Sequence, residues 1–237
     1  MTFRELINEV LIRLREDTIS SDWSGGINDS SNDANISAYQ RVIGSLVNDA
    51  KGHVESRCDW IALRETFTIA TVASTMAYTL GDDDSGAGSN PRILDVINQA
   101  TGTHLSQVGN EWLNSRSFPA ADIATGEPYY YAINGTTSVV TTRPPDINID
   151  LYPLPTEAQN INFNLIKIQP HMTTATEILK VPVNPVILGA WARAIAERGE
   201  DGGTQSSLMA QEANEALKQA ILLDSGNTQY EADWYIN

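Results

Sequence analysis

Residue types that carry catalysis are few and scattered in this sequence. Its histidines are His53, His104 and His171, and Cys58 is the single cysteine. Nucleophilic catalysis needs a nucleophile, a base and an orienting group, and no histidine stands at metal-ligand spacing from Cys58 or from another histidine. We interpret His53 as a polar-face helix residue and Cys58 as a packed thiol. The sequence predicts no catalytic residue, no metal site and no cofactor, so we do not expect an enzyme.

The acidic run Asp82–Asp84 is the cluster that most suggests a bound cation. An EF-hand loop that begins at Asp82 needs glycine at its sixth position and glutamate at its twelfth. Ala87 and Ile93 occupy those two positions. The following "GAGSN" has no lysine after it and opens no clear helical pattern, unlike a phosphate-binding loop. We therefore interpret this stretch as a solvated acidic turn.

Charge and composition exclude several classes of protein. The chain has 237 residues and a formal net charge of −15, which is enough length for one large domain or two small ones. No apolar run approaches the roughly 20 residues that a membrane helix needs, and the charged, amphipathic N-terminus is not typical of a signal peptide. The lone cysteine indicates a reducing compartment. A surface that grips phosphates needs a basic face, and the acidic balance argues against one.

Amphipathic helices are predicted at both ends of the chain. Apolar residues from Phe3 to Leu14 recur at helical spacing, and Thr2 with Glu5 makes a capping-box pattern. A second helix follows a long polar loop and ends near Cys58. Toward the C-terminus, "NPVILGAWARAIAERGEDGG" predicts a helix with Pro185 at its first position, and a last helix spans about 204–223.

The middle of the chain has the pattern of short antiparallel strands. In "INIDLY", apolar residues alternate with polar ones, and "LRETFTIATV" is rich in β-branched residues. Asn134-Gly135, between "YYYAI" and "TTSVV", predicts a two-residue hairpin turn because both central positions of such a turn need positive φ.

These patterns together predict an α+β fold. Residues 1–60 and 182–224 are expected to form a discontinuous helical bundle, because each amphipathic pair has a face that it cannot bury alone. Residues 61–181 are expected to form an inserted antiparallel β-sandwich or barrel-like module. Residues 225–237 would then be an extended C-terminal tail.

The order of these elements resembles the head-to-tail connector (adaptor) proteins of tailed bacteriophages, the tail tubular protein A family. The matching stretches are "ISAYQRVIGSLVNDAKGHVESRCDW" for a helix that leads into a Trp-bearing strand entry, "GEPYYY" for a G-x-P-x-x-Y strand entry, "INIDLYPLP" for a strand followed by prolines, and "ILKVPVNPVILGAWARAIAERGED" for the closing helices. The resemblance covers most of the chain. It departs at the loops 17–33 and 81–90, so loop contacts cannot be carried over.

The resemblance implies a structural virion protein of the neck, assembled in the host cytoplasm. Proteins of that family form a homo-oligomeric ring, a dodecamer, which lies under the portal protein and extends the DNA channel to the tail nozzle. It implies no membrane contact, and genomic DNA that passes through without specific binding. The acid excess suits such a channel. The resemblance also assigns portal docking to the tail, whose aromatic composition is typical of interface anchors: Tyr230, Trp234, Tyr235 and Ile236.

The tyrosines of "GEPYYYAING" are interpreted mainly as the wall of the β-module. In a strand, Tyr129 and Tyr131 share one face and Tyr130 takes the other. We expect Tyr129 and Tyr131 to pack the module. Tyr130 is a candidate contact with a neighbouring subunit or the nozzle, since tyrosine offers both apolar area and a hydroxyl. Trp23, in the polar loop, is a second candidate contact.

Two alternatives remain open from the sequence. One is a neck or tail-completion protein of a long-tailed phage, which differs in the partner bound by its lower face. The other is a β-sandwich carbohydrate-binding module, in which Trp23, Trp112 and the tyrosines form a sugar platform. That module would be a soluble monomer that retains glycans, and it leaves the helical ends unexplained.

Overall fold

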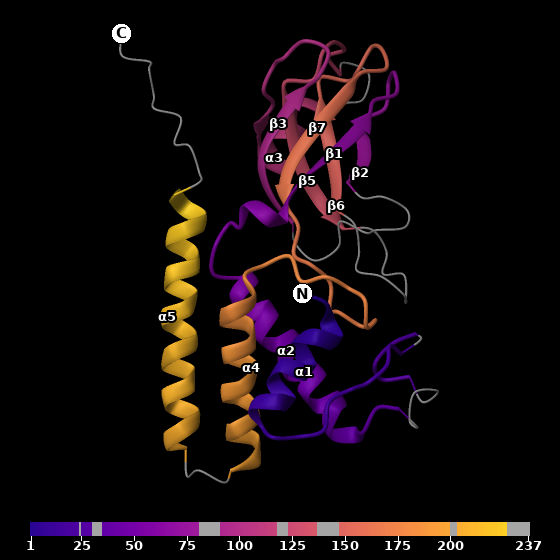
Figure 1. The fold of residues 1–237 in the computed structure, drawn as a ribbon. Helices are drawn as coiled ribbons and strands as arrows, with labels where there is room; N and C mark the ends of the chain where they lie inside the picture. The colour runs from indigo at the N-terminus through magenta and orange to yellow at the C-terminus, as the bar shows by residue number, and fades with distance from the viewer. Residues whose placement is uncertain are drawn as a thin grey trace. The chain divides into compact units, whose positions relative to one another are not determined.

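The computed structural model describes residues 1–23, 25–29, 35–80, 91–117, 123–136, 147–199 and 203–226. The chain divides into two units (Figure 1), one formed by Met1–Leu63 with Gln169–Asn237 and the other by Arg64–Ile168. Helices from both ends of the chain and an inserted sheet region confirm the predicted α+β fold. The acidic turn Asp82–Asp84 and the aromatic residues of the tail lie outside the described residues.

The helical unit contains α1 (Phe3–Arg13), α2 (Ala38–Glu55), α4 (Val183–Arg198) and α5 (Thr204–Gly226). The capping box of Thr2 and Glu5 is confirmed at the start of α1. A second capping box, formed by Ser37 and Gln40, begins α2. These boxes satisfy backbone N–H groups that have no partner within the helix. One face of α1 and one face of α2 bury apolar side chains such as Leu6 and Ile43 completely.

The boundaries of α4 differ from the sequence expectation. The helix begins at Val183 with Pro182 at the N-cap, so Pro185 lies at the third helical position and not at the first. Proline is tolerated there because the N–H groups of the first turn have no intrahelical acceptor. Gly199 ends the helix in the left-handed conformation, with φ 66°, which glycine adopts without steric cost.

The segment 169–181 belongs to the helical unit, whereas the strand pattern assigns it to the β-module. It has no regular strand, and its backbone pairs with the N-terminal region. Phe3 N–H donates to the carbonyl of Glu177 (2.8 Å), and the Asn48 side chain both donates to and accepts from the backbone of Met172. These bonds form only in the tertiary structure, so local periodicity carries no signal of them.

The β unit consists of two sheets. One has the order β1 (Arg64–Ala70), β7 (Asn160–Ile166), β3 (Arg92–Asn98), and the other the order β2 (Ala77–Leu80), β6 (Ile147–Tyr152), β5 (Tyr130–Thr136), β4 (Ser106–Gln107). Their pairings are antiparallel except for the short parallel pair β4–β5. Both sheets contribute to one apolar core, which includes Phe163, Ile149 and Val96.

Two local features of the β unit depart from the sequence patterns. A helix, α3 (Asn110–Ser117), lies inside the region expected to be all β. Asn134-Gly135 does not form a hairpin turn, because both residues lie within β5 at a shift of its register with β6. Gly135 has φ 84° there, so the positive φ that favours Asn-Gly turns serves a bulge. The Asn134 amide donates to the buried Asp150 carboxylate at 2.8 Å.

Candidate interaction site

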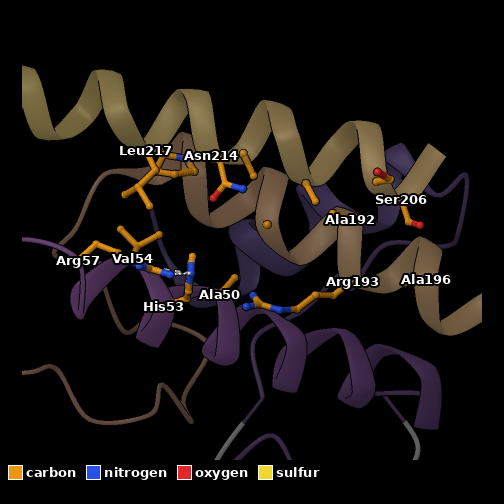
Figure 2. A pocket seen from close by; sticks show the side chains of 15 residues that line it. Ala50, His53, Val54, Arg57, Ala192, Arg193, Ala196, Ser206, Asn214 and Leu217 are labelled. Atoms are coloured by element: carbon orange, nitrogen blue, oxygen red, sulfur yellow. Dashed lines mark hydrogen bonds between the residues drawn. The ribbon is translucent and has the colours of Figure 1, made fainter. Parts of the chain in front are cut away.

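A groove of about 490 Å³ runs between α2, α4 and α5 in the helical unit (Figure 2). Its walls combine small apolar residues with a few polar ones. The lining residues are Ala50, His53 and Val54 from α2, Arg57 from the turn after it, Pro185, Gly189, Ala192, Arg193 and Ala196 from α4, and Ser206, Ser207, Ala210, Ala213, Asn214 and Leu217 from α5. A concave, mostly apolar site with a few convergent polar groups is the usual form of a binding site.

Small side chains keep this groove open. A Cβ added at Gly189 would lie 3.5 Å from the Cβ of Ala50, an ordinary packing distance, so α4 and α2 lie in near contact at this point. On α5, Met209 and Leu217 are the buried residues among those described, although the helix has 23 residues. Leu208, Leu222 and Leu223 remain exposed. The helix α5 therefore leaves apolar surface beside and beyond the groove.

Three nitrogen-rich side chains line the α2 side of the groove. Arg57 Nη2 lies 2.9 Å from His53 Nε2, and Arg57 Nε donates to the same nitrogen at 3.3 Å. Arg193 points toward the same part of the groove from α4 (Figure 2). Among the described residues, neither arginine has a carboxylate partner within ion-pair distance. Two arginines in one groove stand out in this chain, because it carries twice as many acidic as basic residues.

The electrostatics of the groove hold His53 neutral at pH 7. Partial burial lowers the pKa of His53 below its ordinary value, and the charges of Arg57 and Arg193 lower it further. Arg57 donates to Nε2, so the neutral ring carries its proton on Nδ1. The groove thus presents two permanent positive charges and a neutral imidazole. Sequence reasoning misses this cluster, although His53 and Arg57 stand four residues apart at the C-terminal end of the predicted second helix.

A buried ion pair lies one turn earlier on α2. Lys51 is 1% exposed, and its Nζ lies 3.4 Å from Glu55 and donates to the carbonyls of Gln169 (2.5 Å) and Pro170 (2.8 Å). Burial lowers the pKa of Lys51 and raises the pKa of Glu55, because desolvation disfavours both charged forms more than the pair restores them. These contacts fasten the segment after β7 to α2.

The β unit carries an aromatic cluster that includes Tyr130. Its ring lies 4.8 Å from the ring of Trp112, which also contacts Tyr152 edge-on at 5.8 Å. The Arg116 guanidinium stacks over the indole at 5.3 Å. Trp112, Tyr130 and Tyr152 are each half-buried, so one side of the cluster remains accessible to a partner.

The two tyrosines beside Tyr130, Tyr129 and Tyr131, differ in burial. Tyr131 is buried and meets Phe163 in a T-shaped contact at 5.8 Å, which places it in the core of the module as expected. Tyr129 is 47% exposed and precedes β5. The alternation of side chains therefore does not extend back to Tyr129, and the expectation that it packs the module is wrong.

Trp23 is a core residue of the helical unit. It is 6% exposed, its ring stands edge-on to Phe3 at 5.9 Å, and its indole N–H donates to the carbonyl of Thr173 at 2.9 Å. These contacts satisfy the side chain within the chain. Trp23 offers almost no area to a neighbouring molecule, so the candidate contact assigned to it from the sequence is not carried further.

We also searched the described part of the chain for metal sites and for membrane-spanning helices. No group of three or more His, Cys, Asp or Glu side chains there has the arrangement of a metal site. None of the helices in the described ranges is both long and apolar enough to cross a bilayer. The groove and the aromatic cluster described above offer shape, apolar area and, in the groove, positive charge.

The chain thus has a helical unit that is interrupted in sequence by a β insertion. The chain belongs to the SU10 adaptor protein family, because the model of that family matches residues 1–233. No curated protein matches it in sequence. The match extends over both units and confirms the bacteriophage adaptor class that the order of elements suggests. The narrower resemblance to tail tubular protein A remains an expectation.

Proposed function

We propose that this adaptor is the ring-forming connector of the phage neck. In this proposal, copies of the chain form a dodecameric ring under the portal protein and extend the DNA channel to the tail nozzle. The observation that carries it is the family match over residues 1–233. The exposed leucines of α5 and the accessible aromatic cluster add support, because a ring subunit needs surfaces that its own fold leaves uncovered.

Charge supports a channel through which DNA passes without adhering. A net charge of −15 disfavours contact with phosphates, whose binding to proteins depends on neutralisation by Lys and Arg. The proposal requires no enzymatic step and no cofactor. It places the protein in the virion after assembly in the host cytoplasm, with the portal, the nozzle and further copies of itself as partners.

Electron cryomicroscopy of intact particles tests this function directly. With no symmetry imposed, the proposal expects this chain in a ring between the portal and the tail, and the map would give the number of copies. A tail-terminator ring bound to its lower face would instead support the alternative of a neck protein in a long-tailed phage. Absence of the chain from particles would overturn the connector role.

We further propose that the C-terminal tail docks on the portal through Tyr230, Trp234, Tyr235 and Ile236. Aromatic residues dominate interface hot spots because they bury large areas at low entropic cost. Replacing Trp234 and Tyr235 by alanine should abolish incorporation of the protein into portal-containing particles. Replacing Asn227 and Thr228 by alanine is the matched control, since it changes the same segment without removing aromatic area. Equal incorporation of both variants would contradict the docking role.

Tyr130 is proposed as a contact with a neighbouring subunit or with the nozzle. Its accessible side belongs to the cluster with Trp112 and Tyr152. Tyr130→Ala should weaken ring or nozzle attachment in particle assembly, whereas Tyr78→Ala, a tyrosine hydrogen-bonded within its own unit, should act only through stability. Retention of free glycans by the cluster would support the carbohydrate-binding alternative in its place.

A further inference from the structure

We infer that the groove between α2, α4 and α5 holds the C-terminal segment 227–237 of the same chain in the free subunit. This interaction is distinct from portal docking and does not depend on it. The segment reads "NTQYEADWYIN" and lies outside the described residues. It combines two acidic residues, Glu231 and Asp233, with three aromatic ones and contains no lysine or arginine.

Charge complementarity is the first argument for this occupant. The groove presents Arg57 and Arg193, which have no acidic partner among the described residues, in a chain with a formal net charge of −15. A carboxylate beside an arginine in a partly desolvated groove forms a stronger hydrogen bond than a neutral pair does. Glu231 and Asp233 supply two carboxylates at a spacing of two residues, which places both on one side of an extended segment.

Shape is the second argument. Seven of the fifteen lining residues are alanine, glycine or valine, and the groove leaves an unfilled volume of about 490 Å³ between three helices. Tyrosine and tryptophan side chains fill such sites well, because their rings are large and rigid and their polar ends can remain in water. Nucleic acid and small free anions fit less well, since most of the wall is apolar.

The connection is the third argument. Leu217 lines the groove and stands nine residues before Gly226, the last residue of α5, a distance of roughly 14 Å along the helix. The eleven following residues span up to roughly 36–40 Å when extended, enough to turn and run back along α5. Figure 2 shows Leu217 at the same end of the groove as Val54 and Arg57, with Ser206 at the other. A returning segment therefore meets His53 and Arg57 first. Its covalent attachment gives it an effective concentration near the millimolar range.

Nuclear magnetic resonance relaxation on the full, ¹⁵N-labelled chain tests the inference. Docking predicts backbone order parameters near about 0.85 for residues 230–236, whereas a free tail gives values below about 0.6. The double variant Arg57→Gln/Arg193→Gln should release the tail and lower its order parameters to the free range. The control Arg15→Gln/Arg64→Gln removes two charges at exposed positions away from the groove and should leave the tail ordered.

A second measurement uses the amide resonances of the groove residues, and not those of the tail. In the variant Trp234→Ala/Tyr235→Ala, the amide resonances of His53, Arg57 and Arg193 should shift, while those of the β unit stay unchanged. A flexible tail in the unmodified chain, or a tail that stays ordered in the groove variant, would overturn the inference. Ordering that disappears on tenfold dilution would also overturn it, because the occupant would then be the tail of a second copy. Unchanged resonances of α1 and of the β unit report that each variant is folded.

Discussion

Two positive charges at the C-terminal end of α2, Lys51 within the helix and Arg57 just after it, occupy environments that differ sharply. Lys51 is buried, paired with Glu55 and bonded to two backbone carbonyls. Arg57 lines an open groove, contacts His53, and has no carboxylate partner among the described residues. The first charge ties together distant parts of the helical unit. The second leaves its charge available to another group.

The difference separates a charge that the fold uses from a charge that the fold leaves available in this chain. A buried charge must find partners within the fold, because desolvation without them costs several kcal/mol. A charge at a partly exposed groove pays much less and can remain unpaired until a ligand arrives. The same criterion separates Tyr131, whose ring is enclosed by the β core, from Tyr130, whose cluster keeps an accessible side.

The largest effect is expected at the buried pair. Lys51→Met leaves the Glu55 carboxylate and two carbonyls buried without their donor, and removal of one partner of a buried ion pair costs about 3–5 kcal/mol. Urea unfolding followed by circular dichroism would measure this loss in the free energy of unfolding. A loss under about 1 kcal/mol would mean that water reaches this site and that the comparison with Arg57 fails.

Removing both partners should restore most of that stability. In Lys51→Met/Glu55→Leu no charge remains buried, and apolar replacements of buried ion pairs are often neutral or stabilising. The two carbonyls that Lys51 contacts stay without a donor, so recovery should be incomplete. The same unfolding measurement checks it, and a double variant as unstable as Lys51→Met would show that the ammonium–carbonyl bonds dominate.

The groove arginines should matter little to stability. Arg57→Gln/Arg193→Gln is expected to change the free energy of unfolding by no more than about 0.5 kcal/mol, as for surface substitutions away from packed features. Differential scanning calorimetry compares the melting temperatures. A marked loss would assign these arginines a structural role and remove the contrast with Lys51.

Among the ion pairs, the exposed pair of Lys218 and Glu215 should contribute least to stability. Lys218 and Glu215 are 2.7 Å apart on α5 with about two thirds of each side chain exposed. Lys218→Gln should cost about 0–0.5 kcal/mol, because solvent screens the pair and the side chains lose entropy in forming it. Chemical unfolding at low and high salt checks this expectation, and a loss comparable to that of Lys51→Met would contradict it.

The smallest expected effect is a pH dependence at His53. Its pKa is lowered in the folded state, first by partial burial and then by Arg57 and Arg193. The unfolded chain therefore binds a proton more readily, so the contribution of His53 to stability is complete above the unfolded pKa and declines as the pH falls below it. His53→Gln should flatten the pH profile of the melting temperature between about pH 5 and 7. An unchanged profile would mean that solvent screens the arginines from this ring.

The sequence alone determined the elements whose causes are local. The capping box at Thr2 and the amphipathic stripe of α1 rest on neighbouring residues, and the structure contains both. The alternation of β6 holds except at Asp150, which is buried. The order of helices and strands also sufficed to suggest the adaptor class that the family match confirms. The aromatic tail stays a prediction, because its residues lie outside the described part of the chain.

Tertiary structure decided the features that depend on distant residues. Trp23 is buried because Phe3 and the carbonyl of Thr173 meet it from 20 and 150 residues away, and no local pattern reports such contacts. Asn134-Gly135 became a bulge within β5 because the pairing with β6 continues past it. The groove exists only once α2, α4 and α5 assemble. Its small residues, taken one by one in the sequence, do not indicate a binding site. Local physics selects the elements, and packing between them decides which side chains remain free to bind.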